Sequence, residues 1–198
     1  CALPICFSTA QKCVEEGCRS IMISDVHPRR LEESVAKLAE MAGGRPVFGQ
    51  LCDVTKEEQV QALINAAEEK LGGVDVLINN AGLGGSKLIV DMTDEEWNKV
   101  IDITLNGTFL MCREYGRRLL AADQPGSIVN VGASYAWTGG PGFAHSSAAK
   151  AGVKNLTETL AVEWGPYGIQ VNCLVPGLMP HEDMTADIQG NLAGTSDK

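Results

Sequence analysis

Three side chains in the second half of the chain have the types and spacing that proton transfer requires. Ser146 and Lys150 stand four residues apart in a segment of helical periodicity, so their side chains lie on one helix face. Tyr135 follows an apolar segment and can turn toward that face. A phenol has a pKa of about 10, so proton transfer near neutrality needs a neighbouring positive charge such as a lysine. The structural alternatives are a helix-capping serine, a solvated lysine and a packing tyrosine.

A carboxylate, Asp25, follows the first apolar strand segment. At the end of a strand in a nucleotide-binding sheet, a carboxylate accepts hydrogen bonds from both ribose hydroxyls of adenosine and repels a 2′-phosphate. Asp25 therefore favours NAD over NADP, while Arg29 and Arg30 close by keep NADP open. The alternative is an ordinary cap for the helix that follows.

Two further strand ends carry groups suited to a nucleotide. After the second strand, Asp53 can accept the adenine amino group while the backbone of Val54 flanks the ring, although an aspartate there is also a common turn residue. After the third strand comes the run containing Asn79, Ala81 and Gly82. Its small residues permit close approach of a ligand, and its amides can tie neighbouring strands together.

Short apolar segments alternate with amphipathic ones along the chain. The predicted strands cover residues 21–23, 46–51, 74–78, 127–131 and 169–175. The predicted helices cover residues 28–42, 55–71, 93–121 and 146–163. This alternation indicates a doubly wound α/β fold, in which a parallel sheet has helices on both faces. Ligands bind such sheets outside the carboxyl ends of the strands, where Asp25, Asp53 and Asn79 stand.

Two helix starts carry the signature of a capping box, in which a threonine and a glutamate three residues later satisfy each other's backbone donors. The pairs are Thr55 with Glu58 and Thr93 with Glu96. The first of these helices is expected to end at the pair of glycines at 72–73.

The composition excludes several classes of protein. The 198 residues carry 25 acidic and 16 basic side chains, and the net charge of −9 removes the electrostatic basis for nucleic-acid binding. No apolar run approaches the roughly 20 residues that span a bilayer. The apolar opening of the chain lacks a basic leader, so we expect a cytoplasmic protein. The three histidines have no ligand spacing, and we expect no metal.

Several motifs occur in an order that resembles the short-chain dehydrogenase/reductase family. They are the acidic turn CDVT, the run NNAG after the third strand, AAKAGV in the last helix and VNCLVPG at the last strand. The resemblance extends from about Thr9 to Gly177. It implies a Rossmann-like fold and an NAD(P)-dependent oxidoreductase, with Lys150, Pro176 and Gly177 added to the cofactor-binding positions.

The catalytic positions depart from the usual pattern of that family. The usual serine, tyrosine, lysine and asparagine fall on Ala133, Ser146, Lys150 and Thr104, so only the lysine remains. A second arrangement, with Tyr135 fifteen residues before the lysine and a serine four residues before it, resembles the 2,4-dienoyl-CoA reductase and enoyl-CoA reductase branch.

That branch implies reduction of an enoyl- or dienoyl-CoA thioester, an activity of fatty acid metabolism. Hydride would attack the far end of the conjugated system and push electrons toward the thioester oxygen. Ser146 would donate a hydrogen bond to the resulting oxyanion, and Tyr135 would protonate carbon as general acid. The alternatives are an alcohol or ketone dehydrogenase that uses Tyr135, and a non-catalytic relative that does not bind a cofactor.

The two ends of the chain differ from the family pattern. We expect residues 1–198 to form a single domain that is truncated or divergent at 1–10 and after 177. The family's first strand and glycine-rich turn are absent, and Pro4 and Cys6 stand where glycines would lie. We expect a homo-oligomer that associates through 93–121 and 146–163.

Overall fold

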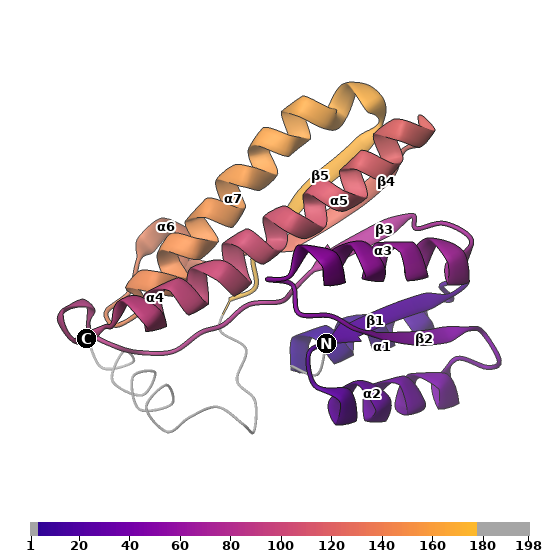
Figure 1. The fold of residues 1–198 in the computed structure, drawn as a ribbon, viewed down its shortest axis with the longest axis horizontal. Helices are drawn as coiled ribbons and strands as arrows, with labels where there is room; N and C mark the ends of the chain where they lie inside the picture. Colours follow the sequence, from indigo (N-terminus) through magenta and orange to yellow (C-terminus); the bar gives the residue numbers. More distant parts are fainter. Residues whose placement is uncertain (1–3, 178–198) are drawn as a thin grey trace.

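Five short strands alternate with helices in the computed structural model, which describes residues 4–177 (Figure 1). The strands are β1 (Ile21–Asp25), β2 (Val47–Leu51), β3 (Val76–Asn79), β4 (Gly126–Val131) and β5 (Ile169–Leu174). Every strand pair is parallel. The expected α/β class and the strand positions are confirmed, because runs that are apolar on both faces must be covered by helices on both sides.

Seven α-helices cover these strands. They are α1 (Pro4–Glu15), α2 (Pro28–Met41), α3 (Glu57–Leu71), α4 (Asp94–Ile101), α5 (Gly107–Ala122), α6 (Tyr135–Thr138) and α7 (Ala144–Trp164). Two 3₁₀ turns, η1 (Ile89–Asp91) and η3 (Gly165–Tyr167), lie between them. The long helix expected over 93–121 is interrupted by the π-helical turn η2 (Asp102–Asn106), which separates α4 from α5. Among these elements, no helix is long and apolar enough to cross a membrane.

The two predicted capping boxes have different outcomes. At α4 the box is formed, because Glu96 N donates to Thr93 Oγ1 at 3.2 Å and Thr93 N donates to Glu96 Oε2 at 2.9 Å. At α3 the prediction is wrong: the Thr55 hydroxyl donates to Asp53 Oδ1 at 2.8 Å, and the helix begins two residues later, at Glu57. The Thr55 hydroxyl bonds to Asp53 rather than to the start of the helix, because the carboxylate is a charged acceptor within the same turn.

The strands form two sheets rather than the single sheet expected. One sheet has the order β1-β2 and the other has the order β3-β4-β5. Figure 1 shows β1 and β2 with α1 and α2 in the lower part of the molecule, and the other three strands with α5 and α7 above them. Hydrophobic periodicity predicts which segments are strands but not which strands are neighbours, and this is why the division was not foreseen.

Each sheet has its own apolar core. The smaller core joins α1, β1 and α2 through residues such as Val14, Ile23 and Leu38. The larger core joins α3, α5, α7 and the three-stranded sheet, and Ile128 lies completely buried within it. The division of the cores resembles that of the sheets, but Met22 of β1 and Cys52 after β2 belong with the larger core.

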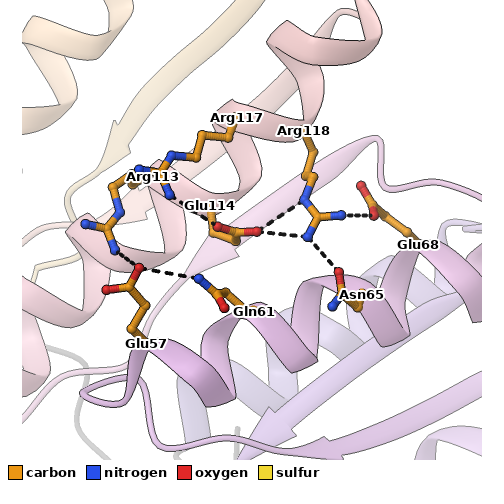
Figure 2. Close-up of polar contacts among 8 residues, drawn as sticks. All are labelled: Glu57, Gln61, Asn65, Glu68, Arg113, Glu114, Arg117 and Arg118. Carbon is orange, nitrogen blue, oxygen red and sulfur yellow. Dashed lines mark hydrogen bonds and ion pairs between the residues drawn. The ribbon is translucent and has the colours of Figure 1, made fainter.

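A polar cluster at the surface links α3 to α5 (Figure 2). Arg118 on α5 pairs with Glu68 on α3 at 3.0 Å and with Glu114 on its own helix at 2.9 Å. Arg113 on α5 pairs with Glu57 on α3 at 2.6 Å. Both arginines thus hold the two helices side by side over the larger core.

Candidate functional site

The ammonium group of Lys150 lies where the carboxyl ends of β3 and β4 meet α7. Its Nζ donates to the carbonyl oxygen of Val131, the last residue of β4. The backbone of Gly82, after β3, passes so close that a β-carbon there would lie 3.5 Å from Lys150 Nζ and 3.4 Å from Thr104 Oγ1. Burial lowers the pKa of Lys150 below its ordinary value. A half-buried lysine therefore stands at the edge of the sheet where ligands of such folds bind.

Thr104 supports this arrangement from η2. It is fully buried, and its Oγ1 accepts a hydrogen bond from Leu83 N at 3.1 Å, which fixes the chain just beyond β3. A π-helical turn inside a helix often marks a functional position. The sequence placed Thr104 at the family's asparagine position but did not indicate this backbone contact. The match of Thr104 to the family's asparagine position was the only feature of the sequence that could have pointed to this contact.

Tyr135 and Ser146 both contact Phe143, the residue before α7. The rings of Tyr135 and Phe143 have centroids 5.0 Å apart, and Ser146 Oγ donates to the Phe143 carbonyl oxygen at 3.4 Å. Tyr135 opens α6 and is 42% exposed. Lys150 stands one turn further along α7 than Ser146. The structure thus brings the serine and lysine onto one helix and the tyrosine beside its start, without a described bond between the phenol and the ammonium.

The loops after β3 and β4 are tied together at the rim of this site. Lys87 N donates to the Gly142 carbonyl oxygen at 2.9 Å, which joins the loop that follows Gly82 to the loop that precedes α7. The Lys87 ammonium donates to both carboxylate oxygens of Glu96 on α4, at 2.6 and 2.7 Å. This pairing lowers the pKa of Glu96 to about 2.

Apolar side chains are exposed on the same loops. Beyond Lys87, the side chains of Leu88, Ile89 and Val90 are largely exposed. Trp137 on α6 is also exposed, and the Lys154 ammonium lies 5.5 Å from the centroid of its ring. Large apolar groups on segments fixed by hydrogen bonds offer a preformed surface for an apolar ligand.

The two carboxylates expected at the adenosine end both stabilise local turns. Asp25 is buried, and its Oδ1 accepts from His27 N at 2.8 Å and from the Arg30 guanidinium at 3.1 Å. Asp53 Oδ1 accepts from the backbone N–H of Thr55 at 3.0 Å as well as from its hydroxyl. The turn role considered as an alternative for Asp53 is therefore present, whereas α2 after Asp25 has His27 as its N-cap and no side-chain cap hydrogen bond.

Asn79 belongs to a buried network between the strands. Its side-chain amide donates to Asn130 Oδ1 on β4 at 2.9 Å and to Cys112 Sγ on α5 at 3.3 Å. Asn130 in turn donates to Thr157 Oγ1 on α7 at 2.9 Å. The expectation that these amides tie neighbouring strands together is confirmed.

The remaining cofactor positions lie at the same carboxyl edge. Val54 follows β2 and packs so closely on Gly107 that a β-carbon there would clash with it. Ala81 follows β3 and is exposed, while Pro176 and Gly177 follow β5 and are half-buried and exposed, respectively. The polar tail after Gly177 lies outside the described residues.

Curated proteins that are similar in sequence to this chain include two that are named as reductases of CoA thioesters. The family model described as short chain dehydrogenase matches residues 2–192. The chain is 40% identical over 184 residues to "(5R,7aS)-5-hydroxy-7a-methyl-1-oxo-2,3,5,6,7,7a-hexahydro-1H-indene-carboxyl-CoA reductase" of Mycobacterium tuberculosis, covering 92% of this chain and 70% of that protein. It is 39% identical over 158 residues to a "Probable 2,4-dienoyl-CoA reductase" of Bacillus subtilis, covering 79% of this chain and 61% of that protein.

Solved structures show the same fold. A short chain dehydrogenase from Mycobacterium smegmatis is 41% identical, with a TM-score of 0.85 over 90% of this chain and 73% of its own. A gluconate 5-dehydrogenase from Burkholderia cenocepacia in complex with NADP has a TM-score of 0.83 at 26% identity, and the match covers 91% of this chain and 69% of that one. An NAD+-bound xylitol dehydrogenase has a TM-score of 0.88 at 29% identity, and the match covers 100% of this chain and 74% of that one. The chain therefore belongs to the short-chain dehydrogenase family, whose members are NAD(P)-dependent oxidoreductases.

Proposed function

We propose that this protein reduces the carbon–carbon double bond of an enoyl- or dienoyl-CoA thioester. The observation that carries the proposal is the position of Tyr135 and Ser146, which both contact Phe143, one helical turn from the half-buried Lys150. In this proposal a phenol, a hydroxyl donor and an ammonium group act together at one strand edge. The position that usually holds the family's tyrosine is occupied here by the serine.

Each of the three residues has a separate task in this proposal. Ser146 donates a hydrogen bond to the thioester oxygen as negative charge develops on it. Tyr135 gives its phenolic proton to the substrate carbon as general acid. Lys150 lowers the energetic cost of the phenolate by its positive charge, and its ammonium has three donors, of which Val131 takes one.

The residues at the strand ends fit a nicotinamide dinucleotide, which supplies the hydride. Asp25 would bind the adenosine ribose and select NAD, because its carboxylate repels a 2′-phosphate. Asp53 and Val54 would flank the adenine. Backbone groups at the other positions, Asn79, Ala81, Gly82, Pro176 and Gly177, would approach the rest of the cofactor together with the Lys150 ammonium.

An acyl-CoA is the substrate class that we infer. Two of the relatives bear names of CoA-thioester reductases. The exposed side chains of Leu88, Ile89, Val90 and Trp137 would contact the apolar acyl group beside Tyr135.

The test measures oxidation of NADH or NADPH by absorbance with a dienoyl-CoA as substrate. We expect Tyr135→Phe to lower kcat by about 100-fold or more, the usual contribution of a general acid. Tyr167→Phe is the matched control, because Tyr167 is also exposed but lies in η3 beyond the far end of α7. Turnover that Tyr135→Phe leaves unchanged would contradict the assignment.

A measurement of cofactor binding separates the remaining alternatives. Binding of NADH without turnover of CoA thioesters, but with turnover of a ketone, would favour an alcohol or ketone dehydrogenase such as the xylitol enzyme of similar fold. The absence of binding would favour the non-catalytic alternative.

We also propose that two copies of the chain associate through α4, α5 and α7. Phe109 on α5 and Val162 on α7 are 42% and 81% exposed, which is unusual for large apolar residues on long helices. A second copy would bury them.

A further inference from the structure

The turn that joins α1 to β1 brings two cysteines together. Cys18 N donates to the Cys13 carbonyl oxygen at 2.9 Å, and Gly17 N donates to the Val14 carbonyl oxygen at 3.1 Å. These nested bonds form a Schellman motif, a common way of ending a helix at a glycine. Gly17 has a φ of +87°, the left-handed conformation that the motif requires. Cys13 and Cys18 therefore occupy the two positions whose side chains often contact each other in this motif.

The backbone hydrogen bond limits the distance between the two cysteines. With standard bond lengths on either side of the 2.9 Å contact, the Cα atoms of Cys13 and Cys18 lie less than about 6.8 Å apart. Disulfides join Cα atoms that are roughly 4.4–6.8 Å apart. The turn thus meets the backbone requirement for a bond between these two thiols.

The two thiol groups lie within electrostatic reach of each other. Burial raises the pKa of Cys13, and the neighbouring Cys18 raises it further. Cys18 packs against the smaller core, to which Val14 of the same turn belongs. Both thiols are free and half-buried, so each remains partly open to solvent.

Arg45 holds this turn in place from the end of α2. Its Nη2 donates to the Val14 carbonyl oxygen at 2.7 Å, its Nη1 to the Cys18 carbonyl oxygen at 3.0 Å and its Nε to the Ala42 carbonyl oxygen at 2.8 Å. A planar guanidinium with three such bonds fixes the backbone on both sides of Gly17. Two thiols on a fixed turn have a high effective concentration, because the entropy of closing the loop has already been lost in folding.

We propose that Cys13 and Cys18 form a reversible dithiol–disulfide pair that is oxidised by small-molecule disulfides such as oxidised glutathione. The thiolate of one cysteine attacks a sulfur of the reagent, forms a mixed disulfide and releases one molecule of reduced glutathione. The thiolate of the other cysteine then attacks the cysteine sulfur of the mixed disulfide, closes the Cys13–Cys18 bond and releases the second. The two cysteines lose two electrons and two protons, and the oxidised glutathione gains both.

The bond would act as a covalent brace at the end of α1. It closes a loop over residues 13–18 and restricts the unfolded chain, so it favours the folded turn by the same factor by which the turn favours the bond. The turn lies at the amino end of β1, and the pair involves neither Tyr135 nor Lys150. This site is therefore independent of the reductase chemistry.

The experiment equilibrates the reduced 198-residue chain with reduced and oxidised glutathione at several ratios. Free thiols are then blocked with N-ethylmaleimide. Trypsin cleaves after Lys12 and Arg19, which leaves both cysteines in one peptide, and mass spectrometry shows whether this peptide has lost two hydrogen atoms. We expect a bond between Cys13 and Cys18 whose equilibrium constant falls by about tenfold or more in concentrated urea, where the turn is absent.

Single substitutions test the second step. Cys13→Ser and Cys18→Ser each leave one thiol of the pair, which can form a mixed disulfide but has no partner to displace the glutathione. We expect the mixed disulfide at the remaining cysteine to increase by about tenfold or more over the parent chain. Cys173→Ser is the matched control, because Cys173 is also free and half-buried but lies on β5, and it should leave the bond unchanged.

Three results would overturn the proposal. The first is a parent chain in which Cys13 and Cys18 stay reduced or carry glutathione at every ratio. The second is a bond from either cysteine to a different cysteine of this chain or to a second copy. The third is an equilibrium constant that urea leaves unchanged, since closeness in the sequence rather than the turn would then join the thiols.

Discussion

Lys87 and Glu96 show how one ion pair fixes a loop at the rim of the candidate site. The lysine reaches both carboxylate oxygens, while Glu96 also accepts from the backbone and side chain of Thr93. One glutamate therefore caps α4 and anchors the loop after β3. The sequence predicted the cap from the spacing of Thr93 and Glu96, but Lys87 has no such fixed spacing and was not foreseen.

This pair predicts a dependence of stability on acid pH. The pKa of Glu96 falls from 4.5 to about 2 in the folded chain, chiefly because of the hydrogen bond from Lys87. The unfolded chain therefore binds more protons between these values, and the stabilisation present above about pH 5 is lost as the pH falls toward 2. We expect Glu96→Gln to be less stable than the parent at pH 6 and to approach it at pH 3, as measured by urea unfolding.

The matched control is Glu95→Gln, on the same exposed turn of α4, where no described bond reaches Lys87. A gap between parent and Glu96→Gln that stays constant from pH 6 to pH 3 would contradict the role of this carboxylate.

At the scale of elements, α5 and α7 approach closely because Gly116 leaves room for an indole. A β-carbon at Gly116 would lie 2.8 and 2.9 Å from two ring atoms of Trp164. We expect Gly116→Ala to destabilise the protein by about 1–3 kcal/mol, the usual cost of overpacking, although alanine is the better helix former. Chemical denaturation measures the free energy of unfolding.

Gly165→Ala provides the comparison for this helix pair. A β-carbon at Gly165 would meet no atom within 4 Å, and its φ of −52° suits any residue. We expect no loss of stability there. Equal losses at both positions would show that the contact between Gly116 and Trp164 is not the cause.

The contact between α3 and α5 depends instead on charge (Figure 2). Arg118 joins Glu68, Asn65 and Glu114, while Arg117 on the same helix lies 3.9 Å from Glu114 and is more exposed. We expect Arg118→Ala to lower the free energy of unfolding by about 1 kcal/mol and Arg117→Ala to have little effect. Urea unfolding at low and high salt tests this, because the difference between the two variants should shrink as salt screens the pairs.

For the whole molecule, periodicity predicted every strand to within a few residues, because buried parallel strands and amphipathic helices have distinct patterns. The donors and acceptors of the amide side chain also predicted that Asn79 can tie neighbouring strands together. Prediction from the sequence failed where the structure depends on contacts that a local pattern does not contain. Thr55 is bonded to a carboxylate instead of a helix end, and the sheet is divided between β1 and β3, a property of strand order that no local pattern contains.

The separate cores have a consequence for how the molecule opens. Val14 and Leu38 belong to a different cluster of buried residues from Ile128, so we expect each cluster to open as a cooperative unit. We expect native-state hydrogen exchange in low denaturant to release the amides of β1 and β2 together, at a lower opening free energy than those of β4. A single opening energy for both groups would contradict this. Separate opening energies would mean that the described part of the fold opens in two steps, with the boundary between β1 and β3.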